Sequence, residues 1–372
     1  MKYLSMLIKP TSSACNLNCD YCFYLDIGEK RGDTNPKFMT KDETRIIIDR
    51  SFDQVEENGH IAFNFQGGEP SLMGLDFYED FLSYAKSKEK NLTLSFTLQT
   101  NGLLLDEKWA KFLKENDFLV GLSIDGDQKT HNSYRKDKKN NKTYEKVLKT
   151  KKIFDKYKVE YNVLTVLTKE LSKEPKALYG FVRDEKIKYL QIIPCLDDFG
   201  KETPYSIKPR DYYEFHKEVF NQWINDLDEG IYTSIKIFDD IVNFILYGRL
   251  GFCGMGGFCT NQNVIESDLS VYPCDFYALD SYKLGNLKDD DFDHLYQAKE
   301  LLEFISKSEK TYEACKTCPL KNYCKGGCRR MKNAMYVEDE SDFCAYRKIF
   351  GLVLVNIDRI KNDLRKIRSK TL

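Results

Sequence analysis

Short apolar runs recur through the first half of the chain and predict a series of buried strands. They lie at residues 4–10, 61–65, 92–98, 118–124, 160–167 and 189–193, and their length suits buried strands. Between them, apolar residues at helical spacing predict helices at residues 41–55, 77–86, 107–116, 142–157 and 178–185. Strands that alternate with helices in this way usually run parallel, with right-handed crossovers. About six such repeats predict an α/β fold with a partial (β/α)6 barrel, short of the eight units of a closed TIM-like barrel.

The pattern changes in the second half of the chain. Helices are expected at residues 210–228 and 235–247, but from residue 251 onward cysteines, glycines and short apolar runs replace the regular alternation. A final amphipathic helix is expected at residues 349–367. This change predicts three parts, namely a barrel at 1–235, a cysteine-rich domain at 236–350 and a C-terminal helix at 351–372.

The balance of charge argues against two classes of partner. The 372 residues include 57 Lys and Arg against 58 Asp and Glu, a net charge of −1. Such a balance is atypical of dedicated nucleic-acid binders and of proteins that bind anionic membranes. The basic run at residues 135–142 is therefore expected to be a solvated loop or helix face. No run approaches the ~20 apolar residues of a membrane span, and residues 1–10 lack the features of a signal peptide, so we expect a cytoplasmic protein.

Twelve cysteines give the main chemical clue. In a reducing cytoplasm, clustered cysteines favour metal ligation over disulfides. Cys15, Cys19 and Cys22 share one short loop, and three thiolates can hold three irons of a [4Fe–4S] cube while the fourth iron stays open to a ligand. Cys195 stands alone at the end of a predicted strand. A buried apolar thiol is the favoured interpretation there, and contact with a cofactor or substrate is the alternative.

Eight further cysteines near the C-terminus could complete two four-cysteine sites. They are Cys253, Cys259, Cys274, Cys315, Cys318, Cys324, Cys328 and Cys344. Structural zinc is the competing interpretation, because Cys315-x2-Cys318 alone fits it well. The presence of the N-terminal three-cysteine loop favours iron–sulfur clusters instead.

Polar and glycine-rich motifs follow three of the predicted strands, at the edge that carries the chemistry in parallel α/β folds. Gln66, Gly67, Gly68, Glu69 and Pro70 follow the strand at 61–65, and Gln99, Asn101, Ser123 and Asp125 follow the next two. Glycines let a ligand approach the backbone, and a carboxylate suits an ammonium group. For any one of the last four residues, ordinary turn chemistry is an equally open interpretation.

The sequence Cys15-x3-Cys19-x2-Cys22 followed by Phe23-Tyr24 resembles the signature of the radical-SAM superfamily. The resemblance implies a [4Fe–4S] cluster whose open iron chelates S-adenosylmethionine (SAM) and whose electron releases a 5′-deoxyadenosyl radical. It also implies that Phe23 or Tyr24 lies near the adenine and that the turn from Gly67 to Glu69 binds the amino group of SAM. Ser123 and its neighbours would hold the ribose or the carboxylate, and Gln66 and Tyr24 are candidates for peptide contacts.

The C-terminal cysteines resemble the SPASM extension of radical-SAM enzymes that modify peptides. The resemblance implies two auxiliary [4Fe–4S] clusters, and therefore three clusters in all. One would be held by Cys253, Cys259, Cys274 and Cys328, and the other by Cys315, Cys318, Cys324 and Cys344. The family usually has glycine five residues before the third of these ligands, where this chain has Leu269. We expect the turn to form there all the same.

Asp275 directly follows Cys274 and is a candidate general base, because a carboxylate anchored beside a metal site can take a proton that a two-electron oxidation releases. Motifs spread over nearly the whole chain resemble those of anaerobic sulfatase-maturating enzymes. They include Leu7-Ile8-Lys9-Pro10, Gln66-Gly67-Gly68-Glu69-Pro70, Val271 to Tyr277 and Cys324-Lys325-Gly326-Gly327-Cys328.

This second resemblance implies oxidation of a cysteine or serine residue of a sulfatase to Cα-formylglycine. The 5′-deoxyadenosyl radical would take a Cβ hydrogen, Asp275 would take the thiol or hydroxyl proton, and an auxiliary cluster would accept the second electron. The expected partners are a sulfatase segment with a Cys-x-Pro-x-Arg or Ser-x-Pro-x-Arg motif and an electron donor such as flavodoxin or ferredoxin. We expect a monomer with no separate peptide-binding domain in front of Cys15.

Two alternatives stay open from the sequence. A SPASM maturase that makes thioether or carbon crosslinks in another ribosomal peptide would use the same cofactors. A zinc-stabilised binding module would use the C-terminal cysteines without radical chemistry. Metal analysis and the optical spectrum separate these classes, because three four-iron clusters predict about twelve irons per chain.

Overall fold

The structure of the chain, a computed structural model, describes residues 1–32, 35–306, 312–338 and 341–371. Its contacts divide it into two compact units, each built from several chain segments. Unit 1 comprises Met1–Ser123, Arg135–Tyr161 and Thr260–Lys307, and unit 2 comprises Ile124–Tyr134, Asn162–Cys259 and Ser308–Leu372. The domain boundaries expected near residues 235 and 350 stay predictions, and residue 372 lies outside the described residues.

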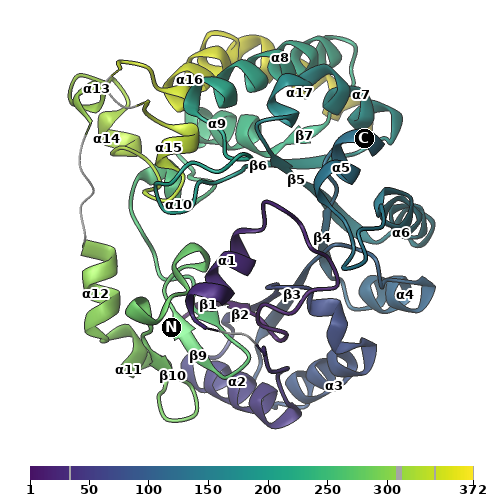
Figure 1. Cartoon of the computed structure of the whole chain (residues 1–372), viewed down its shortest axis with the longest axis vertical. Helices are drawn as coiled ribbons and strands as arrows, with labels where there is room; N and C mark the ends of the chain where they lie inside the picture. The colour runs from purple at the N-terminus through teal and green to yellow at the C-terminus, as the bar shows by residue number, and fades with distance from the viewer. Residues whose placement is uncertain (33–34, 307–311, 339–340, 372) are drawn as a thin grey trace. The chain divides into compact units, whose positions relative to one another are not determined.

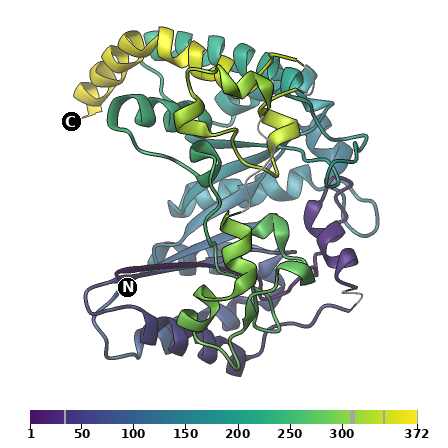
Figure 2. The same ribbon diagram turned by 90° about the vertical axis from the view of Figure 1, so that its left-hand side faces the viewer.

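Unit 1 is built on a sheet with the strand order β10-β9-β8-β1-β2-β3-β4. Four parallel strands form its centre, namely β1 (Tyr3–Ile8), β2 (His60–Phe65), β3 (Thr93–Thr100) and β4 (Leu119–Ser123). β8 (Val264–Ile265) pairs parallel to β1, and β9 (Ser270–Tyr272) and β10 (Gly285–Asn286) continue the sheet antiparallel. A segment from the second half of the chain, light green in Figure 2, therefore lies beside β1.

The helices of unit 1 lie around the outside of these strands, as Figure 1 shows. They are α2 (Lys41–Gln54), α3 (Leu75–Lys86), α4 (Glu107–Glu115) and α6 (Tyr144–Tyr157), and all four agree with the predicted ranges to within a few residues. Thr40 and Glu43 form the capping box that begins α2. Aromatic side chains fill the space between strands and helices, for example Phe65 of β2 against Tyr78 and Phe81 of α3, each with ring centres 5.1 Å apart.

Short helical turns complete unit 1 and were not predicted from the sequence. They are α1 (Phe23–Lys30), η1 (Pro70–Met73), η3 (Asp275–Tyr277), η4 (Asp280–Tyr282), α11 (Phe292–Tyr296) and α12 (Lys299–Ser306). α1 begins directly after Cys22, which is its N-cap. It packs through Tyr24 and Ile27 into a buried cluster with Tyr272 and Ala278, so the residues after the third cysteine are fixed against the segment that carries Cys274.

Unit 2 holds the parallel strands β5 (Glu160–Leu167), β6 (Tyr189–Pro194) and β7 (Ser234–Ile235). Its longer helices are α7 (Pro175–Asp184), α8 (Pro209–Asp228) and α9 (Lys236–Tyr247). Shorter pieces are α5 (Gln128–Tyr134), η2 (Leu171–Lys173), α10 (Cys253–Gly256), α13 (Glu313–Lys316), α14 (Lys321–Cys324) and α15 (Lys332–Met335). Trp223 of α8 anchors the core, with its indole N–H donating to the carbonyl of Thr233 over 2.8 Å.

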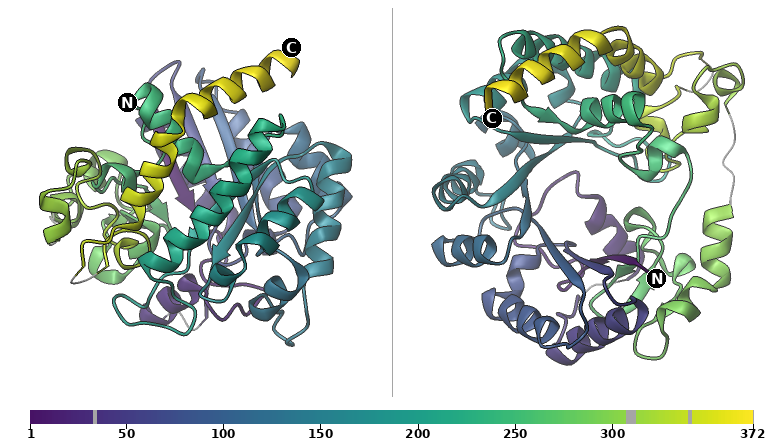
Figure 3. Two further views of the ribbon diagram at one scale, coloured as in Figure 1. Left: turned by 90° about the horizontal axis from the view of Figure 1, so that it is seen from above. Right: turned by 180° about the vertical axis from the view of Figure 1, so that it is seen from behind.

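The prediction of one continuous final helix at residues 349–367 is wrong. The structure has two helices, α16 (Ala345–Val355) and α17 (Ile357–Thr371), separated at Asn356. The Asn356 side chain donates to the carbonyl of Leu352 over 2.9 Å, and such local bonds let asparagine compete with helix continuation. The left panel of Figure 3 shows the two yellow helices beside the teal α8. Among the described helices, none combines the length and the apolar composition that crossing a membrane requires.

Candidate functional site

The three N-terminal cysteines lie on the loop between β1 and α1, and all three are partly buried. Burial raises the pKa of the Cys22 thiol, while the backbone N–H groups of Leu25 and Tyr24 at the start of α1 act in the opposite direction. Burial also raises the pKa of Cys15 to about 12, with smaller increases from Glu69 and Cys22. Two thiols that interact electrostatically on one loop fit a shared cluster, whose irons would take the place of the thiol protons.

Arg135 contradicts the expectation of a solvated basic run. Its residue is 8% exposed, and its guanidinium lies 5.6 Å from the centre of the Tyr21 ring. Against the larger effect of burial, its positive charge lowers the pKa of both Cys15 and Cys22. In the rest of the run, Lys138, Lys139 and Lys142 are exposed as expected, and Lys136 is half-buried.

The Gly-Gly-Glu-Pro motif packs directly against the cysteine loop. The amide of Gly68 donates to the carbonyl of Ser12, and the amide of Glu69 donates to the carbonyl of Ala14, each over 2.8 Å. Gly67 has φ = +119°, a conformation that favours glycine. These backbone bonds bring the predicted SAM-binding turn next to the predicted cluster loop within unit 1.

The buried carboxylate of Glu69 accepts hydrogen bonds from neighbouring groups of the protein. Its Oε1 accepts from the amide of Ser71 (3.0 Å) and from the hydroxyls of Ser71 (2.6 Å) and Thr100 (2.7 Å), and its Oε2 accepts from the amide of Asn101 (2.7 Å). Burial raises the pKa of this carboxyl, and these donors oppose the rise. Glu69 therefore joins the end of β2 to the end of β3, and a role toward the SAM amino group stays a prediction.

The remaining predicted cofactor contacts lie at strand ends in both units. In unit 1, Gln99 donates to the hydroxyl of Ser123 over 3.0 Å, and Asn101 donates to the side chain of Asn16 over 2.7 Å, one residue after Cys15. The backbone N–H of Gln66 donates to the carbonyl of Ile8 over 2.9 Å. In unit 2, Asp125 is 1% exposed and accepts from the amide of Val166 over 3.0 Å. Asp125 thus supports the backbone, and ligand contact by any of these residues stays a prediction.

Asp275 lies on the η3 turn of unit 1, directly after Cys274. Its amide donates to Gln262 Oε1 over 2.9 Å, and its carboxylate Oδ1 lies 2.5 Å from the ammonium of Lys9 at the end of β1. Phe276, the next residue, packs against Phe23 with ring centres 5.2 Å apart. The candidate base is therefore fixed to the same helix that follows the three-cysteine loop.

Three cysteines predicted for one auxiliary cluster lie together in unit 2. Burial raises the pKa of Cys253, and the nearby thiols of Cys328 and Cys259 raise it further. A Cβ atom built on Gly254 would lie 2.9 Å from Cys328 Cβ, which shows how closely the two chain segments approach. The fourth predicted ligand, Cys274, belongs to unit 1, and its part in this cluster stays a prediction.

The four cysteines predicted for the other auxiliary cluster line one pocket in unit 2. Cys315, Cys318, Cys324 and Cys344 share its wall with Tyr336 and Tyr346. Burial raises the pKa of Cys344 to about 11, and the thiols of Cys324, Cys315 and Cys318 add to the rise. In the described part of the chain, no three His, Cys, Asp or Glu side chains gather around one ion-sized point. The four cysteines instead face a shared space, and four soft thiolates fit a [4Fe–4S] cluster.

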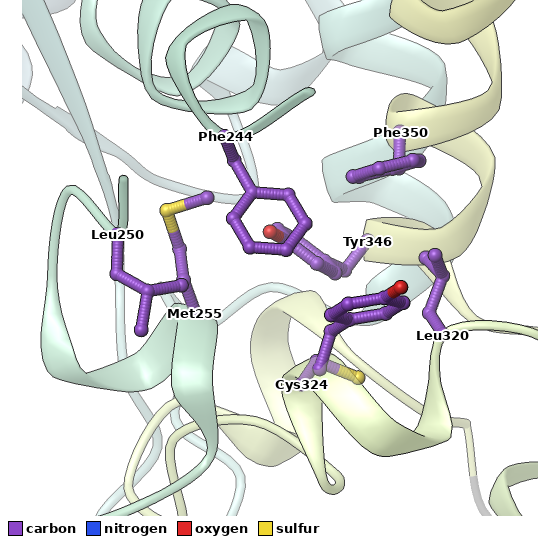
Figure 4. A pocket seen from close by; sticks show the side chains of 8 residues that line it. Phe244, Leu250, Met255, Leu320, Cys324, Tyr346 and Phe350 are labelled. Carbon is purple, nitrogen blue, oxygen red and sulfur yellow. The ribbon is translucent and has the colours of Figure 1, made fainter. Parts of the chain in front are cut away.

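An apolar pocket adjoins this cysteine pocket. Figure 4 shows Phe244, Leu250, Met255, Leu320, Tyr346 and Phe350 around Cys324, and Leu320, Cys324 and Tyr346 line both pockets. Apolar walls control solvent access and the local dielectric beside a metal site. The surroundings of Cys324 are therefore suited to a protected cluster.

Comparison with known proteins decides between the families that share these motifs. Residues 10–182 match the radical SAM superfamily, and residues 253–319 match SPASM, an iron–sulfur cluster-binding domain. The chain is 42% identical to a cysteine-type anaerobic sulfatase-maturating enzyme of Clostridium novyi (strain NT), over 94% of this chain and 95% of that protein. The chain belongs to the family of anaerobic sulfatase-maturating enzymes. As a member of this family it is a radical SAM enzyme that uses [4Fe–4S] clusters and SAM.

Two further comparisons agree with this family. The solved structure of native anSMEcpe with bound AdoMet and Cp18Cys peptide has a TM-score of 0.86 and 41% identity, covering 98% of this chain and 99% of that chain. A serine-type anaerobic sulfatase-maturating enzyme of Bacteroides thetaiotaomicron is 28% identical, over 98% of this chain and 92% of that protein. The expected α/β radical-SAM fold with a SPASM domain is confirmed.

Sequence reasoning missed four buried partners of the site, namely Lys9, Ser12, Arg31 and Glu266. Only Lys9 gave a signal, because a lysine that directly follows the apolar residues Leu7 and Ile8 of a predicted strand is seldom fully buried unless it is paired. The contacts among these residues join segments far apart in the chain, which no local pattern reveals. Cys195, by contrast, is buried as expected, with 3% of the residue exposed.

Proposed function

We propose that this sulfatase-maturating enzyme oxidises a cysteine residue of a sulfatase to Cα-formylglycine. The higher identity to a cysteine-type relative (42%) than to a serine-type relative (28%) supports the choice of cysteine. The observation that carries the proposal is the placement of Asp275. A partly exposed carboxylate, fixed on a turn beside Cys274 and paired with a buried ammonium, suits a proton acceptor for a peptide side chain.

The residues present fit the cofactors that this reaction needs. Cys15, Cys19 and Cys22 would hold the cluster that binds SAM, and the eight C-terminal cysteines would hold the auxiliary clusters. When bound, these groups supply a 5′-deoxyadenosyl radical that removes one Cβ hydrogen atom and an acceptor for one further electron.

Asp275 supplies the remaining step. Its carboxylate takes the thiol proton of the substrate cysteine, so the side chain has lost one hydrogen atom, one proton and one electron in all. The product is a thioaldehyde, and water converts it to the aldehyde of formylglycine with release of hydrogen sulfide. The exposed part of Asp275, 18% of its side chain, is the side from which a substrate can reach it.

We further infer that the enzyme is a cytoplasmic monomer that receives electrons from a flavodoxin or a ferredoxin. Reductive cleavage of SAM needs a low-potential electron, which such carriers supply. Formation of 5′-deoxyadenosine with a reduced flavodoxin or ferredoxin in place of dithionite supports this donor class. No formation with either carrier, under conditions where dithionite works, contradicts it.

A direct experiment is anaerobic incubation of the reconstituted enzyme with SAM, a reductant and a peptide that contains Cys-x-Pro-x-Arg. We expect mass spectrometry to find an aldehyde in place of the thiol, and a hydrazide probe to label the product. The matched Ser-x-Pro-x-Arg peptide is expected to react more slowly. A crosslinked peptide that keeps its sulfur would favour the alternative maturase, and zinc without iron would favour the binding module.

A further inference from the structure

Lys9 is a fully buried ammonium at the end of β1. Its side chain is 0% exposed, and its backbone is fixed on both sides, since its amide donates to Ile265 and its carbonyl accepts from Ser12. A buried charge is costly unless charged or hydrogen-bonding partners surround it. The groups around the Lys9 ammonium therefore indicate which part of the site its charge stabilises.

Asp275 is the nearest charged partner of Lys9. The Nζ of Lys9 lies 2.5 Å from Asp275 Oδ1, against 4.0 Å from Glu266 Oε1. The same ammonium lies 3.4 Å from the centre of the Tyr24 ring, in the range of a cation–π contact. Lys9 is thus held between an aromatic face and the carboxylate of the candidate base.

Glu266, the other carboxylate near Lys9, forms an ion pair with Arg31, so Lys9 pairs with Asp275. Glu266 is 3% exposed, and its Oε1 lies 2.8 Å from Arg31 Nη1. Its two oxygens also accept from the hydroxyls of Tyr24 and Ser12, the latter over 2.9 Å. Because Arg31 neutralises Glu266, the four charged groups divide into two pairs, Arg31 with Glu266 and Lys9 with Asp275.

The exposure of the two partners separates their roles. The Asp275 side chain is 18% exposed, whereas the Lys9 side chain is enclosed completely. Lys9 therefore has no surface with which to touch a substrate, and it acts through the carboxylate beside it. Gln262 fixes the backbone of Asp275, but Lys9 is the one positively charged side chain among the described residues that lies within 4.0 Å of its carboxylate.

We propose that Lys9 is a positioning residue that aims the Asp275 carboxylate at the substrate, with Arg31 and Glu266 as the supporting ion pair. The inference rests on the proposed role of Asp275 as proton acceptor. A carboxylate held by an adjacent fixed charge loses little freedom during the reaction, and small displacements of a reacting group cost large factors in rate. Lys9 adds no proton transfer of its own.

The test compares two products of one anaerobic assay, 5′-deoxyadenosine and formylglycine. Lys9→Met keeps the length of the side chain and removes its charge. We expect the kcat for formylglycine to fall on the order of 10²-fold, while the KM for the peptide and the release of 5′-deoxyadenosine stay close to those of the parent enzyme. Lys9→Arg, which keeps the charge, should recover part of the loss.

A double variant distinguishes positioning from general structural support. If Lys9 acts through Asp275, then Lys9→Met/Asp275→Asn should form product no more slowly than Asp275→Asn alone. Multiplied losses would overturn the inference. Lys151→Met is the matched control, because Lys151 is also a buried lysine of unit 1, 5% exposed and 3.0 Å from Asp155. We expect it to leave both products unchanged.

The outcomes also separate this inference from the proposed function. Undiminished formylglycine formation by Asp275→Asn would remove the base and, with it, the basis for the inference. A large loss in Asp275→Asn without any loss in Lys9→Met would overturn the role of Lys9 alone. If Lys9→Met fails to retain its iron, Lys9→Gln takes its place, because glutamine keeps a hydrogen-bond donor at this position. Its ratio of formylglycine to 5′-deoxyadenosine then tests the role of Lys9 by the same criteria.

Discussion

A Cβ atom on Gly68 would lie 2.0 Å from the carbonyl oxygen of Ala14. The distance is far shorter than any carbon–oxygen contact that a folded protein tolerates, so the two segments approach as closely as they do only because residue 68 is glycine. The contact joins the loop of Cys15 to the Gly-Gly-Glu-Pro turn. Two motifs that are distant in the sequence are thus parts of one packed structure.

Gly68→Ala should therefore impair SAM cleavage. The obstacle is backbone rather than a flexible side-chain end, so the cysteine loop has to move to accommodate the methyl group. We expect 5′-deoxyadenosine formation to fall at least about tenfold, since a 1 Å displacement of reacting groups costs about 10²-fold. Gly180→Ala is the control, because a Cβ there meets nothing within 4 Å, and it should leave cleavage unchanged. Parental activity in Gly68→Ala would show that the loop yields without cost.

Leu269 makes the turn at which the resemblance to the SPASM extension predicts glycine, and it does so with φ = +68° and a side chain that is 0% exposed. A side chain in this left-handed region costs about 1–2 kcal/mol, but burial of leucine contributes about 1.5–3 kcal/mol. Leu269→Ala keeps the strain and loses the packing, whereas Leu269→Gly loses both. We expect both variants to be less stable than the parent, with the glycine variant more stable than the alanine variant by about 1 kcal/mol.

Urea unfolding of the two Leu269 variants checks this order. Elsewhere in folded chains alanine usually stabilises relative to glycine, so the reversed order is specific to the backbone conformation. An alanine variant as stable as the glycine variant would mean that the turn relaxes to negative φ.

His216 should make the stability of the enzyme depend on pH. Burial lowers the pKa of this imidazole to about 4 from an ordinary value of 6.5, and Nδ1 donates to the carbonyl of Tyr212 over 2.7 Å. Below pH 6.5 the unfolded chain binds a proton that the folded chain excludes, so stability falls as the pH falls from 6.5 toward 4. Between pH 7.0 and 5.5 we expect a loss of about 1 kcal/mol from this group. His216→Gln, compared by urea unfolding of the iron-loaded enzyme, should lack this part of the pH dependence.

Loss of one pocket cysteine should remove one cluster and leave the others. Cys318 is buried and lines the pocket with Cys315, Cys324 and Cys344. For Cys318→Ala we expect iron content to fall by about a third, from about twelve irons to about eight, while SAM cleavage by the N-terminal loop persists. Cys195→Ala is the control, because Cys195 belongs to none of the predicted ligand sets, and it should keep the full iron content. Unchanged iron in Cys318→Ala would contradict the assignment.

The sequence predicted the elements that depend on local signals. Thr40 and Glu43 marked the start of α2, and the apolar runs marked the strands of unit 1, because periodicity and capping act over a few residues. α1 was missed since it is only eight residues long and begins at a cysteine rather than at a usual cap. Arg135 was misjudged because its burial depends on Tyr21 and the cysteine loop, which lie far away in the chain.

The candidate site was predictable only where chemistry is carried by residue type and spacing. The spacing and order of the cysteines indicated the family, which the comparisons bear out, whereas the assignment of individual cysteines to clusters stays a prediction. The Lys9 and Glu266 contacts join the first strand to the segment after residue 260, and such long-range pairing follows from the assembled sheet. In the sequence, the one sign of these contacts is the charged Lys9 at the end of an apolar strand.

The segment from Lys9 to Cys15 has a consequence for how this enzyme can be altered. At one end it carries Lys9, the ion-pair partner of the proposed proton acceptor Asp275, and at the other it carries Cys15, the first of the proposed cluster ligands. An insertion or deletion within it would disturb the start and the end of the catalytic cycle together, and could release radicals that no longer lead to product. Redesign toward a different peptide is therefore better begun on the segment after Cys274, with this stretch kept at its present length.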